Sequence, residues 1–580
     1  MNRKKQKYKI VIPRVIRRFK RRLRRRLRQG IPHRQIFAFL SLIVVIICLY
    51  SLIGVLRTAD FKKYYGTQKV LFINITNEEA VLPSEIKYEN GEIYLPFDLV
   101  KENIDGNIYR TEEKDRIIIT TPQSVIRLRS EDNKAYLNGN ALELNMPVYD
   151  TEYLPSSVLE QFYPVDLSYN EENNTLTLTY TDRQYLKGTI KKATYLKYTP
   201  EGLSLNVRKL KKGDEVKALA QGDKYTLVTT SDGLCGYILT SRISDMTAIE
   251  PTAPEVEPKQ VWTCTDGKAN IVFDQVTNST ANTNYERIPI REGVDVICPT
   301  WFSFENTNGD IRNLADRAYV DNAHKQGIKV WGLLTDNFSS EISHAVLSDP
   351  DTREHVIKQL LAYSSLYNLD GINIDFEAVP KEDGELFVQF LRELAPMLHN
   401  EGLTLSADFF VPKAWTYHYQ RGKCAEVLDY VIVMGYDQHY SGSDKAGSNA
   451  EISWSREAIT ATLAQNVPKE KLILGIPFYT RVWTINNETG ELSQKAMGMK
   501  AAKDFMTEKG GIIKWNEEAG QNYAEVKDAF NTYKCWFEDT DSLKLRLELV
   551  WEYDIAGTAA WKSGLETSDV WGVLKDELKK

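Results

Sequence analysis

The sequence predicts an α/β fold, with a (β/α)8 TIM barrel in the C-terminal part, preceded by small mainly-β domains and one N-terminal transmembrane helix. Three observations lead to this prediction. Apolar strand-like runs alternate with helical stretches over residues 263–580, which is typical of a parallel sheet covered by helices. Short alternating strands with polar turns fill residues 70–245. An uncharged apolar run of 21 residues, 36–56, is long enough to span a bilayer.

The N-terminus is expected to place the protein in the cell membrane. Residues 1–35 form a basic arm, since residues 1–34 hold 16 of the 73 lysines and arginines and no acidic residue. The positive-inside rule puts this arm in the cytoplasm, residues 36–56 in the lipid bilayer as a single-pass anchor, and the catalytic domain outside the cytoplasm. A cleaved signal peptide fits less well, because the apolar run is long and no small-residue cleavage site follows it. The arm either lies on the inner leaflet as an amphipathic helix or only sets the topology.

Charge and cysteine content exclude several classes of protein. Beyond the arm, 57 basic residues stand against 79 acidic ones, which argues against nucleic acid as a partner. The six cysteines form no CxxC pair and the seven histidines form no cluster. We therefore expect no metal site and no cofactor.

Residues 70–182 are predicted to form a β-rich domain. Strand-like segments such as RIIIT and SVIRL alternate with hairpin-turn signals at Asn90-Gly91 and Asn138-Gly139. This layout resembles the copper-amine-oxidase N-terminal-like domain of bacterial surface proteins. The resemblance implies no copper here, because the segment contains neither histidine nor cysteine. We interpret the domain as a spacer or a wall-binding module.

A second β domain is predicted at residues 185–245, followed by a linker at residues 246–262. The segments GTIKKATYLKY, LNVRKLKKGDEVKAL and KYTLVTTSDGLCGYILTSRI have the rhythm of a small barrel and resemble a bacterial SH3-like domain. Such domains often bind cell-wall peptides, and a purely structural β module is an equal alternative. The linker is rich in proline and glutamate and poor in apolar residues, which is typical of an extended segment.

Eight strand candidates define the predicted barrel. They are residues 269–276, 294–301, 329–335, 371–377, 403–410, 430–436, 471–478 and 557–561. Helical stretches such as 353–367, 384–398 and 456–464 fall between them. Eight repeats in this length favour a closed barrel over an open sheet, and the active residues of such a barrel lie at the C-terminal ends of the strands.

The fourth strand carries the most specific chemical pattern. In the segment LDGINIDFE, apolar residues alternate strictly with Asn373, Asp375 and Glu377, so the three polar side chains share one face. In a barrel covered by helices that face points inward, where polar groups must be hydrogen-bonded or functional. A calcium loop would need a glycine turn between its ligands. A purely structural polar network is the other alternative.

The same segment resembles the DGxDxDxE signature of glycoside hydrolase family 18, the chitinase family. Further matches follow in chain order: MGYD with the sixth-strand MxYD motif, GIPFYTR with the seventh-strand GxPxYGR segment, and Ala560-Trp561 with the eighth-strand tryptophan. The segments PTWF and YDQHYSGS resemble the bacterial cell-wall and spore-cortex branch, an N-acetylglucosaminidase branch that acts on peptidoglycan. The likeness covers about residues 263–570.

This resemblance implies a retaining mechanism in which the N-acetyl group of the substrate is the nucleophile. It assigns the catalytic acid to Glu377, the group that orients the acetamide to Asp375, and a hydrogen bond to the acetamide oxygen to Tyr436. The spacing independently puts Asp375 beside Glu377, about 6.5–7 Å along the strand, where its charge should raise the pKa of Glu377. Substrate contacts are expected from Asn373, Trp561, Asp437, Met434, Arg481, Tyr479, Trp301 and Phe302.

One position departs from the family pattern. Asn373 stands where the family has an aspartate that can share a proton with the next aspartate. The cell-wall branch also has asparagine there, so peptidoglycan is favoured over chitin as the substrate. The leading hypothesis is therefore a cell-wall glycosidase. The alternatives are a non-catalytic chitinase-like lectin and an anchored wall scaffold whose barrel is vestigial.

Overall fold

A computed structural model describes residues 33–65, 71–74, 78–81, 86–111, 116–130, 134–148, 150–171, 175–244, 246–251, 259–282 and 292–580. The chain divides into two compact units, each described separately below: residues 1–106 with 145–254, and residues 107–144 with 255–580. Most of the predicted basic arm, 1–32, and the middle of the predicted linker, 252–258, lie outside the described residues.

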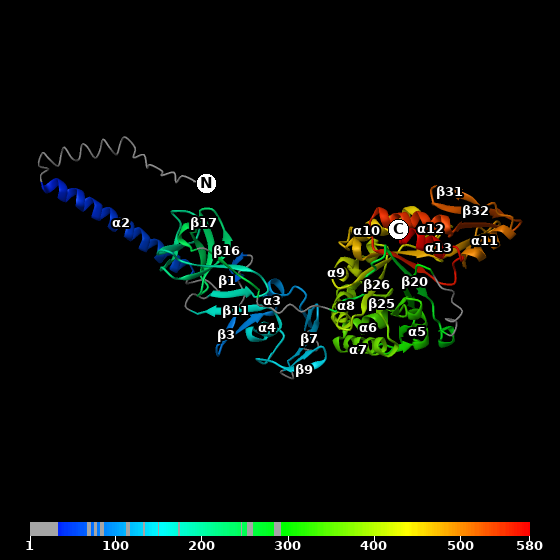
Figure 1. Cartoon of the computed structure of the whole chain (residues 1–580), viewed down its shortest axis with the longest axis horizontal. Coiled ribbons are helices and arrows are strands. Elements are labelled where there is room, and N and C mark those ends of the chain that lie inside the picture. The colour runs from blue at the N-terminus through cyan, green and yellow to red at the C-terminus, as the bar shows by residue number, and fades with distance from the viewer. Residues whose placement is uncertain are drawn as a thin grey trace, which may run out of the picture. The chain divides into compact units, whose positions relative to one another are not determined.

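The second unit contains the predicted barrel (Figure 1). All eight predicted strands form, and each pairs in parallel with its neighbours in the order β21-β20-β34-β28-β27-β26-β25-β24. A further parallel pairing of β21 with β24 closes the ring. The bounds are β20 Ala269–Asp274, β21 Val296–Pro299, β24 Lys329–Thr335, β25 Gly371–Asp375, β26 Thr404–Phe410, β27 Tyr430–Met434, β28 Leu472–Pro477 and β34 Gly557–Trp561.

Helices cover the outside of the ring because they carry apolar side chains on the face toward the strands. Helix α8 shows this well, with Phe387, Phe390 and Leu394 fully buried. The helices are α5 Arg317–Lys325, α6 Ser340–Ser348, α7 Pro350–Tyr367, α8 Gly384–His399, α9 Arg421–Ala425, α10 Ile452–Leu463, α12 Thr540–Glu552 and α13 Val570–Leu578, with short 3-10 turns η3 Lys381–Asp383, η4 Ala414–Tyr419 and η5 Lys469–Lys471.

Two additions to the barrel were not predicted. The short hairpin of β22 Phe302–Phe304 and β23 Ile311–Asn313 extends the sheet beside β24. A five-stranded antiparallel sheet with helix α11 (Met499–Glu508) is inserted between β28 and α12 (Figure 1). Its strands are β29 Tyr479–Asn486, β30 Leu492–Gly498, β31 Lys514–Asn516, β32 Gln521–Lys527 and β33 Asn531–Phe537.

A third sheet belongs to the barrel unit although its sequence lies inside the predicted 70–182 domain. Its antiparallel strands are β5 Tyr109–Thr111, β6 Arg116–Thr121, β7 Ser124–Arg129, β8 Lys134–Leu137 and β9 Asn140–Glu143. Arg127 of β7 forms an ion pair with Glu393 of α8, and Asn400 donates a hydrogen bond to the backbone oxygen of Gln123. The structure therefore divides the predicted 70–182 segment between two units.

The first unit is built mainly of β strands, as predicted for small β domains. One part has two small sheets, β11-β12-β1-β2 and β10-β4-β3, and the helices α3 Phe97–Asn103 and α4 Ser156–Phe162. Their strands are β1 Leu71–Asn74, β2 Glu78–Val81, β3 Lys87–Glu89, β4 Glu92–Pro96, β10 Tyr153–Pro155, β11 Val165–Asn170 and β12 Thr175–Tyr180.

The predicted SH3-like segment contributes six strands to a seven-stranded antiparallel sheet around a small apolar core that includes Leu196, Val228 and Ile238. The seventh strand, β19, comes from the start of the predicted linker, so the domain extends beyond its predicted end. Its order is β15-β14-β18-β17-β16-β13-β19. The bounds are β13 Tyr185–Thr189, β14 Thr194–Lys197, β15 Asn206–Leu210, β16 Glu215–Gln221, β17 Tyr225–Thr230, β18 Cys235–Leu239 and β19 Thr247–Ile249, with the 3-10 turn η1 Thr240–Arg242.

Helix α2, His33–Tyr65, contains the predicted anchor at residues 36–56. Among the described residues, no helix has the length and apolarity needed to cross a membrane. The predicted transmembrane helix and its lipid bilayer partner are therefore not supported by the structure.

Candidate active site

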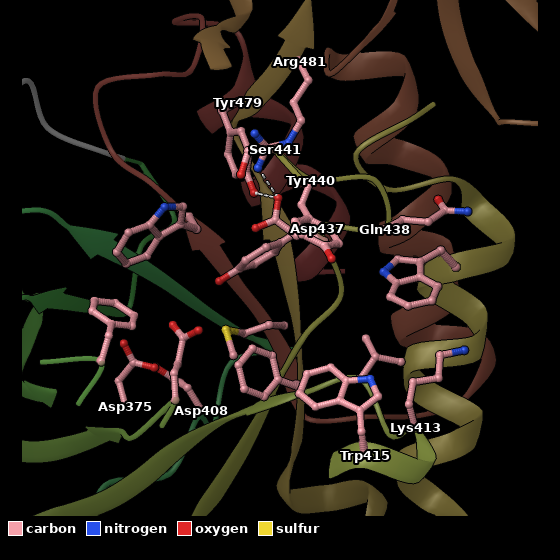
Figure 2. A pocket seen from close by; sticks show the side chains of 18 residues that line it. Asp375, Asp408, Lys413, Trp415, Asp437, Gln438, Tyr440, Ser441, Tyr479 and Arg481 are labelled. Atoms are coloured by element: carbon pink, nitrogen blue, oxygen red, sulfur yellow. Dashed lines mark hydrogen bonds and ion pairs between the residues drawn. The ribbon is translucent and has the colours of Figure 1, made fainter. Parts of the chain in front are cut away.

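A pocket of about 810 Å³ opens at the C-terminal ends of the barrel strands, where the sequence predicted the active site (Figure 2). Eight of the predicted site residues line this pocket: Asp375, Glu377, Met434, Tyr436, Asp437, Tyr479, Arg481 and Trp561. The other lining residues were not predicted: Phe338, Asp408, Phe410, Val411, Lys413, Trp415, Gln438, Tyr440, Ser441 and Trp454.

Glu377 lies two residues beyond the end of β25, and the backbone around it is fixed by a buried carboxylate. Asp336, directly after β24, accepts hydrogen bonds from the backbone N–H of Ala378 at 2.7 Å and from the Ser343 hydroxyl at 2.8 Å. Burial, reinforced by the charges of Asp336 and Asp437, raises the pKa of Glu377 to about 7. A carboxyl group with this pKa is still partly protonated at neutral pH, as a general acid must be.

Asp375 and Asp408 form a buried pair of carboxyl groups on the floor of the pocket. Burial and the neighbouring charges of Asp408, Glu377 and Asp336 raise the pKa of Asp375 well above its ordinary value. Burial also raises the pKa of Asp408 to about 8, although a hydrogen bond from Asn373 opposes this shift. Two like charges this close and this buried do not both ionise readily.

Asn373 lies beneath the pocket and not on its surface. Its amide nitrogen Nδ2 donates to Ser406 Oγ at 3.0 Å and to Asp408 Oδ1 at 3.1 Å, and the residue is fully buried. Asn373 was predicted to contact the substrate, but it does not line the pocket. Its amide instead holds Asp408, whose carboxyl group does line the pocket.

Polar side chains after β27 and on β29 form one wall of the pocket. Asp437 adopts a left-handed backbone conformation with φ of 55°, and its Oδ1 accepts hydrogen bonds from Tyr479 Oη at 2.7 Å and from Arg481 Nη2 at 2.5 Å (Figure 2). Tyr436, directly before it, is held beside Tyr479 with ring centroids 6.2 Å apart. The arrangement supplies fixed hydrogen-bonding groups for the hydroxyl or amide groups of a ligand.

Aromatic side chains surround the carboxyl groups. Trp561 packs on Phe273 with ring centroids 5.5 Å apart and presents its remaining surface to the pocket. Trp415 and Tyr440 stand at the rim and are 63% and 53% exposed. Flat apolar faces beside hydrogen-bonding groups are suited to stacking against sugar rings.

The comparisons with known proteins agree with this geometry. The family model described as glycosyl hydrolases family 18 matches residues 301–566, the segment that contains most of the barrel and its pocket. Residues 301–566 are a family 18 glycosyl hydrolase domain. A second model, the copper amine oxidase N-terminal domain, matches residues 74–178 and confirms the resemblance predicted for that segment.

Curated relatives align with the family 18 domain. A putative sporulation-specific glycosylase of Bacillus subtilis (strain 168) is 30% identical over 264 residues, which is 44% of this chain and 62% of the relative. A cortical fragment-lytic enzyme of the same organism is 27% identical over 248 residues, 41% of this chain and 57% of the relative. The chain thus spans about three fifths of the length of these two relatives. The crystal structure of the spore cortex-lytic enzyme of Bacillus cereus is 22% identical and covers 57% of this chain and 77% of its own, with a TM-score of 0.48.

Two of the predicted substrate contacts do not reach the pocket of the family 18 domain. Trp301 is 1% exposed, packs edge-on against Tyr319 and donates a hydrogen bond from Nε1 to Asn282. Phe302 is equally buried and stacks on Tyr363. Both belong to the apolar core outside the ring, because β21 ends at Pro299, before either residue. The prediction that they form further sugar subsites is corrected accordingly.

Asp408 is the most important site residue that the sequence reading missed. The signal was present: in TLSADFF, Ser406 and Asp408 alternate with apolar residues, so both face the barrel interior like Asn373 and Asp375.

Among the described residues, no group of three or more histidine, cysteine, aspartate or glutamate side chains is arranged to hold a metal ion.

Proposed function

We propose that the family 18 domain hydrolyses glycosidic bonds in glycans that contain N-acetylglucosamine, and that peptidoglycan is favoured over chitin as its substrate. The observation that carries the proposal is Glu377. Its carboxyl group lines a large pocket and has a pKa of about 7, while Asp375 and Tyr436 line the same pocket. This combination suits an acid that must give up a proton and later take one back.

The proposed mechanism uses the substrate's own acetamide as the nucleophile. Glu377 protonates the glycosidic oxygen while the acetamide carbonyl oxygen attacks the anomeric carbon, so that the leaving sugar departs and a positively charged oxazolinium forms. Asp375 orients the acetamide N–H and stabilises the positive charge. Tyr436 donates a hydrogen bond to the acetamide oxygen. Glu377, now ionised, takes a proton from water, which attacks the anomeric carbon and restores the acetamide.

The remaining pocket residues would bind the sugar chain. The face of Trp561 is suited to stacking under the sugar whose bond is cleaved, and Trp415 and Tyr440 extend the apolar surface toward the rim. Asp437, together with Arg481 and Tyr479, offers hydrogen bonds to hydroxyl groups. Met434 also lines the pocket.

The choice of peptidoglycan rests on the curated relatives, which include cortical fragment-lytic enzymes. We further propose that the domain acts outside the cytoplasm, because peptidoglycan is located there. The acidic balance of the chain beyond its basic arm does not itself attract an anionic wall, so recognition would depend on contacts within the pocket.

The full chain should be incubated with purified peptidoglycan and, in parallel, with chitin oligomers. We expect soluble fragments from peptidoglycan with N-acetylglucosamine at the new reducing ends, and slower cleavage of chitin oligomers. Faster cleavage of chitin would overturn the substrate assignment. If the protein binds both polymers and cleaves neither, it is a glycan-binding protein and the proposed activity is wrong.

A further inference from the structure

The pairing register of two barrel strands sets Asp408 beside Asp375. Strand β25 pairs with β26 so that Asn373 lies opposite Ser406 and Ile374 opposite Ala407. One residue further, the same register brings Asp375 next to Asp408, at the strand spacing of about 4.8 Å. Both residues line the pocket, and Figure 2 shows them near each other on its floor.

The two carboxyl groups are more than nine-tenths buried and incompletely hydrogen-bonded. Asp408 Oδ1 accepts from Asn373 Nδ2 at 3.1 Å, which leaves its second oxygen free to carry a proton. Asp375 Oδ1 is buried and, within the described part of the chain, has no hydrogen-bond partner. A buried carboxylate oxygen without a donor is costly, and a protonated Asp408 would supply that donor.

We infer that Asp375 and Asp408 share one proton, and that Asp408 is the positioning residue that holds this proton while Asp375 acts on the substrate. Asn373 completes the arrangement, because its amide can hold Asp408 in place but cannot itself take up a proton. This inference deepens the proposed function and depends on it for the role of Asp375.

The surroundings of the pair favour a single negative charge. The groups that act on it from neighbouring elements are Glu377, Asp336 after β24, the Cys298 thiol of β21 and the Tyr436 hydroxyl after β27. Among the residues that the structure describes, no cation contributes to the pKa shift of either member, and the raised pKa values of both residues agree with one retained proton. When the oxazolinium forms, the proton stays on Asp408, so Asp375 carries the negative charge beside the cation. When water restores the acetamide, the pair shares the proton again.

The kinetic test compares Asp408→Asn with Ser406→Ala. Ser406 is fully buried and also accepts from Asn373 Nδ2, but its hydroxyl group does not ionise at the pH values used, so it controls for a purely structural role. The readout is the pH profile of kcat/KM on an N-acetylglucosamine oligomer. We expect wild-type activity to fall above about pH 7 as Glu377 ionises, and more steeply above about pH 8, with a logarithmic slope approaching about −2, as the pair loses its proton.

In Asp408→Asn the side-chain amide remains a permanent donor, so the slope should stay at about −1. Asp408→Leu supplies no donor and should lose at least roughly tenfold in kcat/KM near pH 6. Ser406→Ala should keep the wild-type profile. The inference is overturned if Asp408→Asn keeps the steeper limb, or if Ser406→Ala changes the profile in the same way.

A second readout does not require activity. Infrared spectra of the wild type and Asp408→Asn, recorded between pH 5 and 9, should differ by a protonated carboxyl band that disappears near about pH 8 in the wild type alone. If the wild type cleaves no glycan but shows this band, the proposed function fails while the shared proton stands. If no such band distinguishes the two proteins, the inference fails whatever the activity.

Discussion

Replacing Glu377 with glutamine is expected to lower kcat/KM on N-acetylglucosamine oligomers by roughly 10²–10⁴-fold, the usual contribution of a general acid. Glutamine has the same shape but cannot give a proton to the glycosidic oxygen. The substrate pocket is otherwise unchanged, so the oligomer should still bind. Initial rates over a range of oligomer concentrations, with binding measured separately by calorimetry, check both parts of the expectation.

Glu382→Gln is the matched control, because Glu382 is an exposed glutamate five residues further along the chain, in the 3-10 turn η3. It should hydrolyse the oligomer at the wild-type rate. An equal loss in both variants would mean that glutamine disturbs the loop and that Glu377 has no special role. Full activity of Glu377→Gln would exclude Glu377 as the acid.

Replacing Glu393 with alanine is expected to destabilise the barrel unit by about 3–5 kcal/mol, because it leaves two arginines buried without their partner. Glu393 is 0% exposed and forms ion pairs of 2.8 Å with both Arg353 of α7 and Arg127 of β7. Although burial opposes ionisation, the charges of Arg353 and Arg127 hold the pKa of Glu393 below its ordinary value. Urea unfolding, followed by tryptophan fluorescence, measures the loss.

The control is Glu385→Ala on the same helix. The Glu385 side chain is 64% exposed in its ion pair with Lys423, so its loss should cost no more than about 1 kcal/mol. Equal unfolding midpoints for the two variants would show that the buried charge cluster does not contribute to the free energy of unfolding. A loss confined to Glu393→Ala would show that this buried charge cluster stabilises the barrel unit.

The barrel could be predicted because each of its strands is a local apolar run whose limits are visible in the sequence. Strands β24 and β34 begin and end at the predicted residues, and β26 begins one residue later than predicted. The alternation in β25 also identified Asp375 and Glu377, because a period of two places both on the interior face.

Other features depend on contacts between distant segments. The sequence alone does not reveal that the β5–β9 sheet belongs with helices α7 and α8, since Arg127 and Glu393 are 266 residues apart. Trp301 was predicted to contact the sugar because a tryptophan ring can stack on one. Strand β21 ends at Pro299, however, and the Trp301 side chain that follows is buried in the apolar core. Asp408 was missed because its meaning depends on Asn373, its hydrogen-bond partner on the neighbouring strand.

Whether the substrate's own N-acetyl group is the nucleophile is tested most directly by the configuration of the first product. Proton NMR spectra recorded immediately after mixing the full chain with an N-acetylglucosamine oligomer distinguish the two anomers before they equilibrate. Attack by the acetamide followed by attack by water predicts that the new reducing end keeps the configuration of the bond that was cleaved. An initial product of the opposite configuration would mean that water attacks directly, and would contradict the roles proposed for Asp375, Tyr436 and Glu377.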